Sequence, residues 1–248
     1  MKVLILKNSE DVASFVATSV IERINEFKPT SENPFFVLGL PTGSTPIPVY
    51  QKLVEAYKNN QVTFKNVVTF NMDEYKGLDA DHDQSYHHFM NENLFDFVDI
   101  PKDQIHILDG VVSDAKAECR SYEEKIKSFG GIDLQLAGIG ENGHLAFNEP
   151  GTSFDSLTHV QKLTDNTIEV NSRFFEKIED VPTHALTIGL RTVFDAKEVF
   201  VLATGEKKAE AVFKSVRGQR DESCPASILQ EHAKAVFICD EAAAKKLK

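Results

Sequence analysis

Residues 138–150 combine groups that can transfer protons with a backbone that can turn tightly. Glycines recur through the first half of this stretch, directly after an apolar run at 134–139 that we expect to form a buried strand. His144 and Glu149 follow, and an imidazole near a carboxylate is suited to proton transfer close to neutral pH. A glycine-rich turn with a surface histidine is the structural alternative that fits the same local pattern.

A second polar cluster lies between a predicted strand at 35–40 and a predicted helix at 47–58. Its members are Thr42, Gly43, Ser44 and Thr45. Hydroxyls, backbone N–H groups and a helix N-terminus can together bind an anion such as a phosphate. The loop matches neither a Walker A motif nor a dinucleotide-binding fingerprint, and a helix simply capped by threonine or serine fits the local sequence equally well.

Two adjacent carboxylates, Asp73 and Glu74, follow a third predicted strand at 67–70. Like charges so close together raise the pKa of one group, which suits a general base. A helix cap, a surface pair and a metal ligand set also agree with two neighbouring acids, and the local sequence alone favours a structural role.

Two cationic positions complete the candidate groups. Lys207 and Lys208 stand where a helix is expected to begin after a strand at 198–203, and cations there oppose the helix dipole unless they bind an anion. Arg173 stands beside two phenylalanines, where it fits either a surface salt bridge or a phosphate-binding fork.

Predicted strands alternate with predicted helices almost throughout, which indicates an α/β fold: a Rossmann-like three-layer αβα sandwich with a mostly parallel central sheet. Residues 1–248 are expected to form a single domain, with 155–182 as the candidate for a mobile flap. The carboxyl ends of parallel strands share one rim, so the polar clusters should gather there. The predicted strands are 2–6, 35–40, 67–70, 104–108, 134–139, 184–190, 198–203 and 235–239. The predicted helices include 47–58, 85–95, 225–230 and 240–248, with Ser9 and either Ser113 or Asp114 as caps of two others.

The composition excludes some partners and cofactors. A formal net charge of −11 argues against nucleic acid or an anionic membrane as a partner, yet it permits an anionic small molecule held by local cations. Tyr86, His87 and His88 are expected to serve packing and surface roles, because adjacent histidines point to different faces of a helix. No metal and no cofactor is predicted. The cysteines, Cys119, Cys224 and Cys239, are typical of reduced, buried thiols in an intracellular protein.

Gathered on one rim, these groups fit chemistry on a phosphorylated sugar. The loop at 42–45 would hold the phosphate. The Asp73 carboxylate would remove a proton from a carbon next to a carbonyl, and the His144 imidazole would move protons between hydroxyls.

Several strings closely resemble the glucosamine-6-phosphate deaminase family, and the likeness runs along the whole chain. They are Leu-Gly-Leu-Pro-Thr-Gly-Ser-Thr-Pro, Asn-Met-Asp-Glu-Tyr, Gly-Ile-Gly-Glu-Asn-Gly-His-Leu-Ala-Phe-Asn-Glu-Pro and Asn-Ser-Arg-Phe-Phe. The resemblance implies conversion of glucosamine 6-phosphate and water to fructose 6-phosphate and ammonium, in amino-sugar catabolism, in the cytoplasm and without a metal.

The same resemblance implies roles for individual residues. Asp73 is similar to the base that moves a proton from C2 to C1 of the sugar. His144 resembles the group that opens the pyranose ring, and Glu149 resembles its orienting partner. The residues that would hold the substrate, chiefly its phosphate, are Thr42, Gly43, Ser44, Thr45, Arg173 and Lys208.

The chain departs from the family pattern at two places. Asn142 stands where some members have Asp, so we expect it to be part of the catalytic group while Glu149 carries more of the electrostatic role. His159 and Gln161 stand where hexameric members regulated by the N-acetylated sugar phosphate have basic residues, and the C-terminus ends early at Lys248. We therefore expect a monomer or small homo-oligomer rather than an allosteric hexamer.

Two other functions share parts of this pattern. A 6-phosphogluconolactonase resembles the fold and has its own glycine-rich loop with histidine, but lactone hydrolysis needs no base at C2. A sugar-phosphate sensor domain would keep the phosphate loop beside a basic helix-turn-helix, and residues 1–35 show no such segment.

Overall fold

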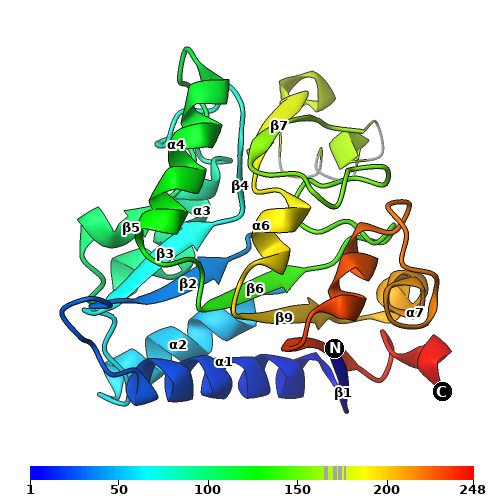
Figure 1. The fold of residues 1–248 in the computed structure, drawn as a ribbon, viewed down its shortest axis with the longest axis horizontal. Helices are drawn as coiled ribbons and strands as arrows, with labels where there is room; N and C mark the ends of the chain where they lie inside the picture. Colours follow the sequence, from blue (N-terminus) through cyan, green and yellow to red (C-terminus); the bar gives the residue numbers. More distant parts are fainter. Residues whose placement is uncertain (165–166, 170–171, 173–174, 176) are drawn as a thin grey trace.

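The computed structural model describes residues 1–164, 167–169, 172, 175 and 177–248, and within them a parallel sheet forms the centre of the fold (Figure 1). Its seven strands pair in the order β1-β10-β9-β6-β2-β3-β5, all in parallel. Their bounds are β1 (Lys2–Leu6), β2 (Phe36–Leu40), β3 (Val67–Asn71), β5 (Ile105–His106), β6 (Leu134–Gly138), β9 (Glu198–Ala203) and β10 (Ala235–Asp240).

Helices cover both faces of this sheet, which makes the three layers that the sequence predicts. In Figure 1, α1 and α2 lie together on one side, whereas α4, α6 and α7 lie on the other. The helices are α1 (Ser9–Glu26), α2 (Ile47–Lys58), α3 (Tyr86–Asn93), α4 (Ala115–Ser128), α6 (Leu190–Phe194) and α7 (Ala209–Arg217). Short 3₁₀ turns span Phe95–Phe97, Lys102–Gln104, Ile178–Asp180, Glu206–Lys208, Pro225–Glu231 and Lys245–Leu247.

Alternate residues of the central strands enter two separate cores. In β9, Val199 and Val201 pack into the core on the α4 and α6 side, whereas Phe200 and Leu202 pack on the α1 and α2 side. A strand buried on both faces reads as a continuous apolar run, and this is why 198–203 could be predicted from the sequence alone.

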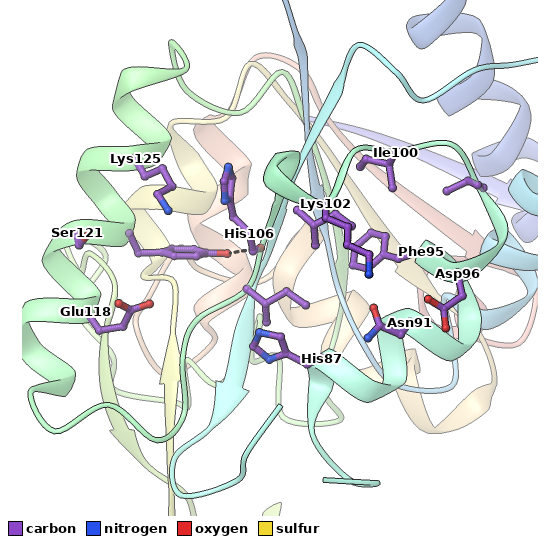
Figure 2. A pocket seen from close by; sticks show the side chains of 14 residues that line it. His87, Asn91, Phe95, Asp96, Ile100, Lys102, His106, Glu118, Ser121 and Lys125 are labelled. Carbon is purple, nitrogen blue, oxygen red and sulfur yellow. Dashed lines mark hydrogen bonds between the residues drawn. The ribbon is translucent and has the colours of Figure 1, made fainter. Parts of the chain in front are cut away.

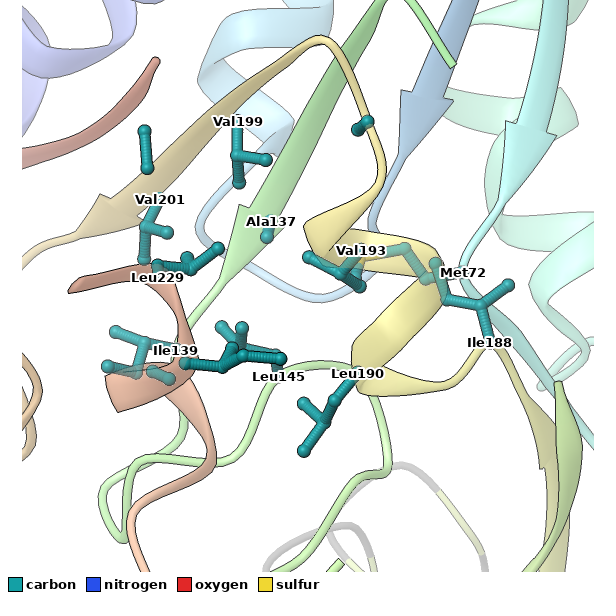
Figure 3. Packing of buried hydrophobic residues seen from close by; sticks show 14 of the residues in the cluster. Met72, Ala137, Ile139, Leu145, Ile188, Leu190, Val193, Val199, Val201 and Leu229 are labelled. Atoms are coloured by element: carbon teal, nitrogen blue, oxygen red, sulfur yellow. The ribbon is translucent and has the colours of Figure 1, made fainter. Parts of the chain in front are cut away.

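The first of these cores also anchors the loop after β6. Figure 3 shows Ile139 and Leu145 in the same cluster as Val201 and Leu190. Leu145 is 0% exposed, and burying a side chain of this kind is worth roughly 1.5–3 kcal/mol. The residue next to His144 therefore fixes the loop to the core.

A second, antiparallel sheet stands beside the first, in the order β4 (Asp73–Tyr75), β8 (His184–Thr187) and β7 (His159–Lys162). The strand predicted at 184–190 is present as β8, but it ends at Thr187 before α6, and it pairs with β4 and β7 in this sheet instead of joining the parallel one. An apolar run shows that a strand is buried but does not show which sheet it joins. Strand β7 lies within 155–182, and the motion of that segment stays a prediction.

Some predicted boundaries are also wrong. Asn8 rather than Ser9 caps α1, since its side chain accepts the Asp11 backbone N–H at 2.9 Å. Instead of the helix predicted at 240–248, β10 ends at Asp240 and the chain continues in turns and a short 3₁₀ segment. Asp240 accepts backbone N–H groups of Gly205 and Ala243, which ties this end to the turn after β9. Of the two proposed caps of α4, the structure uses Asp114.

The three cysteines are buried free thiols, as predicted. Within the described ranges, no helix is long and apolar enough to cross a membrane.

Candidate active site

Loops at the carboxyl ends of β2, β3, β6 and β9 enclose one cavity of about 260 Å³. Strands β2 and β6 are neighbours, and the chain continues from them toward opposite edges of the sheet, so the cavity lies at a topological switch point. The predicted site residues that line the cavity are Thr42, Gly43, Ser44, Thr45, Asp73, Asn142, His144 and Lys208. Glu149 lies behind His144, and Arg173 lies outside the described residues.

The loop after β2 presents its hydroxyls and its glycine to the cavity. Gly43 has a φ of +93°, a conformation that residues with a side chain rarely adopt, and this lets the loop turn sharply into the helix. Helix α2 begins behind Pro46, whose cap position makes no side-chain hydrogen bond. The alternative in which Thr or Ser merely caps this helix is therefore wrong.

Asp73 begins β4 and is only 7% exposed. Burial raises the pKa of its carboxyl group, and the charge of Glu74 raises it further, to about 8. A carboxyl group whose pKa lies near the working pH can both accept a proton and return it. The predicted effect of two adjacent acids is present, although burial is the larger cause.

Tyr86 lines the same cavity, although its sequence context indicated only packing or surface exposure. Its ring stacks on Phe147, with centroids 6.1 Å apart and an interplanar angle of 5°. Burial, followed by the charges of Tyr75 and Asp73, raises the pKa of Tyr86 well above its ordinary value, so the hydroxyl stays neutral. No linear motif marks this residue, because α3 brings it to the site from a polar stretch.

His144, Asn142 and Glu149 form a connected group in the loop after β6. The Asn142 side-chain N–H₂ donates to Glu149 Oε2 at 2.8 Å, and its carbonyl oxygen accepts the His144 backbone N–H at 3.2 Å. His144 Nδ1 lies 3.6 Å from Glu149 Oε2, which is ion-pair distance. Asn142 therefore orients the carboxylate and the loop, whereas Glu149 faces the imidazole.

Glu149 is 4% exposed, yet its pKa moves in the opposite direction from that of Asp73. Burial raises the pKa of Glu149, but His144, the Thr167 hydroxyl and the Asn142 amide outweigh burial and lower it to about 2. The carboxylate is therefore ionised near neutral pH and can stabilise a protonated imidazole. Thr167, which donates to Glu149 and lines the cavity, was not singled out by the sequence.

The backbone of this loop allows the histidine ring to pack closely. A Cβ atom on Gly140 would lie 2.3 Å from the His144 ring, so only glycine leaves space for the imidazole. Ala146 has a φ of +52°, a conformation that costs about 1–2 kcal/mol for a residue with a side chain. The buried neighbours Leu145 and Phe147 hold it there, and such strain is common in functional loops.

Lys208 ends the turn that follows β9 and reaches the cavity, whereas Lys207 does not line it. No group of three or more His, Cys, Asp or Glu side chains in the described part of the chain could hold a metal ion. The arrangement thus offers an anion-binding loop, a carboxyl group with a raised pKa and an imidazole backed by a carboxylate.

Comparison with known proteins agrees with this arrangement. Residues 7–238 match the profile of the family described as glucosamine-6-phosphate isomerases/6-phosphogluconolactonase. The chain belongs to this family.

Individual relatives match along almost the full chain. A glucosamine-6-phosphate deaminase of Treponema denticola is 53% identical over 99% of this chain and 91% of that protein. The corresponding enzyme of Yersinia enterocolitica is 50% identical over 100% of this chain and 93% of that protein.

Among the solved structures, a deaminase matches this chain more closely than a lactonase does. The structure of a monomeric glucosamine-6-phosphate deaminase has a TM-score of 0.93 and 40% identity, and the match covers 99% of both chains. A 6-phosphogluconolactonase from Thermotoga maritima has a TM-score of 0.75 and 24% identity, covering 96% of this chain and 99% of that one, and shares the fold alone.

Proposed function

We propose that this chain converts glucosamine 6-phosphate and water to fructose 6-phosphate and ammonium, as a step of amino-sugar catabolism. The observation that carries the proposal is that Asp73, His144 and the loop at 42–45 line one cavity. At about 260 Å³, the cavity is slightly smaller than the usual range for small-molecule sites, roughly 300–1,000 Å³, which suits a ligand no larger than a single hexose phosphate.

Ring opening comes first, because only the open-chain sugar has a carbonyl that acidifies the proton on C2. His144 takes the proton from O1 and gives one to O5. Glu149 lies behind the imidazole at ion-pair distance and is ionised, which stabilises the protonated ring between these two transfers.

Proton transfer between carbons follows. The Asp73 carboxylate removes the proton from C2 and returns it to C1, which turns the amino aldose into a ketose imine. Water adds to C2 of the imine and ammonia leaves, so that fructose 6-phosphate and ammonium are formed. A carboxyl group with a pKa of about 8 is a stronger base than an ordinary aspartate, which suits the weak acidity of a carbon acid.

The substrate phosphate is assigned to the hydroxyls and backbone of Thr42, Gly43, Ser44 and Thr45, together with Lys208. Arg173, which lies outside the described residues, is proposed as a further phosphate ligand on the resemblance alone. The charged oxygens of a phosphate can accept hydrogen bonds from several donors at once. The loop and the lysine together therefore favour a phosphate over a neutral hydroxyl.

We further propose a monomer or small homo-oligomer without activation by the N-acetylated sugar phosphate. His159 and Gln161 on β7 bond to each other, with Nε2 to Oε1 at 3.2 Å, and they offer no pair of fixed positive charges to a phosphate. Rate curves that this ligand converts from sigmoidal to hyperbolic would contradict the proposal. A cytoplasmic location is proposed from the reduced cysteines.

Ammonium release from glucosamine 6-phosphate tests the function, with N-acetylglucosamine 6-phosphate as the control that carries no free amine. We expect release only from the free amino sugar. A parallel assay with 6-phosphogluconolactone separates the two enzyme types, because hydrolysis of the lactone without ammonium release would replace the proposal with the lactonase.

A further inference from the structure

Glu74 is 0% exposed and adjacent to Asp73, but the mechanism above gives it no role. Successive side chains of a strand point to opposite faces, so Asp73 faces the cavity while Glu74 points away from it, toward α3. An ionised carboxylate at this depth is costly unless donors surround it.

Donors do surround this carboxylate. It accepts the backbone N–H groups of Tyr75, Tyr86 and His87 at 2.7–3.1 Å, and His87 Nδ1 lies 2.9 Å away. The N–H groups of Tyr86 and His87 belong to the first turn of α3, where the helix dipole favours a negative charge. These contacts stabilise the anion and also fasten the first turn of α3 to β4.

That turn carries a side chain of the candidate active site. Tyr86 is the first residue of α3, and its ring lines the cavity and stacks on Phe147. The place of the Tyr86 ring beside Asp73 therefore depends on where Glu74 holds the turn. The charge of Glu74 also acts on Asp73 directly, since it is a cause of the raised pKa of that group.

His87 connects Glu74 with a different cavity. Figure 2 shows its ring among the residues of a second cavity of about 610 Å³, whose wall also carries His106, Glu118 and Lys125. The His87 side chain is 28% exposed, whereas that of Glu74 is 1% exposed. Glu74 therefore lies between a solvent-accessible histidine and the buried Asp73.

We propose that Glu74 is a positioning residue for the reaction: its carboxylate holds Tyr86 beside Asp73 and supplies a fixed negative charge behind Asp73. This inference rests on the proposed function, because it gives Glu74 its role through Asp73. The other ionisable groups of the described chain that face this pair are Tyr50 from α2, Tyr75 from β4, Tyr86 and His87 from α3, Tyr122 from α4, and His144 and Lys208 across the cavity.

Two substitutions separate the charge from the geometry. Glu74→Gln removes the negative charge, so ionisation of Asp73 becomes easier and the rising limb of kcat/KM against pH moves to lower pH by about one unit. Glu74→Asp keeps the charge but is one methylene shorter and reaches fewer donors. We expect it to leave the pH limb in place and to lower kcat by at least about fivefold through the displaced Tyr86.

A measurement without substrate makes the test independent of activity. The Asp73 carboxyl group is titrated by ¹³C NMR in aspartate-labelled protein, with Asp73→Asn to identify its signal, and its pKa should fall in Glu74→Gln. If the wild type releases no ammonium, the proposed function fails while this titration still tests the charge. Glu92→Gln is the control, because it removes an exposed charge of α3 that pairs with His88. It should change neither the pH dependence of kcat/KM nor the titration of Asp73.

An unchanged pH limb and an unchanged Asp73 titration in Glu74→Gln would overturn the role of the charge. Wild-type kcat in Glu74→Asp would overturn the role in positioning. If Glu74→Gln does not fold, Glu74→Asp decides alone: a lowered kcat with the wild-type pH limb supports the inference, and any other result rejects it.

Discussion

Two carboxyl groups of the same cavity region expose little surface to solvent, yet the protein moves their pKa values in opposite directions. Asp73 is 7% exposed with a pKa of about 8, and Glu149 is 4% exposed with a pKa of about 2. Burial acts to raise both values. Asp73 lies deeper in the protein, so burial raises its pKa more. The neighbours add to the difference, because Glu149 receives donors and faces an imidazole, whereas Asp73 has the charge of Glu74 beside it.

The contrast matches the two tasks proposed for these groups. A base at a carbon acid needs a high proton affinity, which an uncompensated burial provides. A partner that stabilises an imidazolium needs to remain ionised throughout the cycle, which hydrogen-bond donors provide. A small exposed fraction by itself therefore does not reveal the role of an acid. The hydrogen-bond donors and charges around the carboxyl group must also be known.

The largest effect is expected when the high-pKa group is removed. Asp73→Asn cannot accept the proton from C2, so kcat for ammonium release should fall by about 10²–10⁴-fold. Circular dichroism and thermal melting of the variant serve as controls for folding. Normal ammonium release by this variant would remove Asp73 from the mechanism.

The next effect concerns the ring that Glu149 faces. Gly140→Ala places a Cβ atom 2.3 Å from the present position of the His144 ring, and displacing a reacting group by about 1 Å costs on the order of 10²-fold in kcat. Gly138→Ala is the matched control, since its Cβ would meet nothing within 4 Å. Imidazole NMR signals of His144 should move in the first variant only, and equal shifts in both would contradict the packing argument.

A smaller difference in kcat is expected between substitutions at Glu149 and at its hydrogen-bond donor Asn142. Glu149→Gln removes the charge that faces His144, and we expect a loss in kcat of about 10–100-fold, as for other groups that orient a functional histidine. Asn142→Ala leaves that charge in place and should cost less than about tenfold. A loss from the Asn142 change that equals or exceeds the loss from Glu149→Gln would show that the amide carries the main role.

The smallest effect is on stability, where the contributions of the two acids should depend on pH in different ways. The pKa of Asp73 is raised from about 4 to about 8 on folding, so its contribution to stability is present at low pH and is lost as pH rises through that interval. Between pH 5 and 8.5, the melting temperature of Asp73→Asn relative to wild type should therefore rise by at least about 3 °C.

Glu149 supplies the control for this measurement. Its pKa is lowered to about 2, so its contribution is present at higher pH and is lost only as pH falls toward that value. To keep the neighbouring imidazole from titrating in this range, the comparison is made in a His144→Gln background. There the difference in melting temperature between the proteins with Gln and with Glu at position 149 should stay constant from pH 5 to 8.5. A constant difference for Asp73→Asn as well would mean that Asp73 is not buried in its protonated form.

Local patterns predicted the elements whose cause is local. The run at 198–203 became β9 with the same bounds, and 47–58 became α2, because apolar periodicity reflects burial along one element. The antiparallel sheet was missed, since β4 has only three residues and its partner β8 lies far away in the sequence, at 184–187. The prediction of a terminal helix failed because the Asp240 carboxylate instead binds Gly205 and Ala243.

The sequence by itself determined the βα order, and with it the gathering of Asp73, His144 and the loop at 42–45 on one rim, because parallel strands all end on the same side of their sheet. Only the tertiary structure decided that Tyr86 joins them, that Asn142 binds Glu149 rather than the imidazole, and that Glu74 faces α3. These relations depend on depth of burial and on donors from distant segments, and neither quantity is encoded in the spacing of residues along the chain.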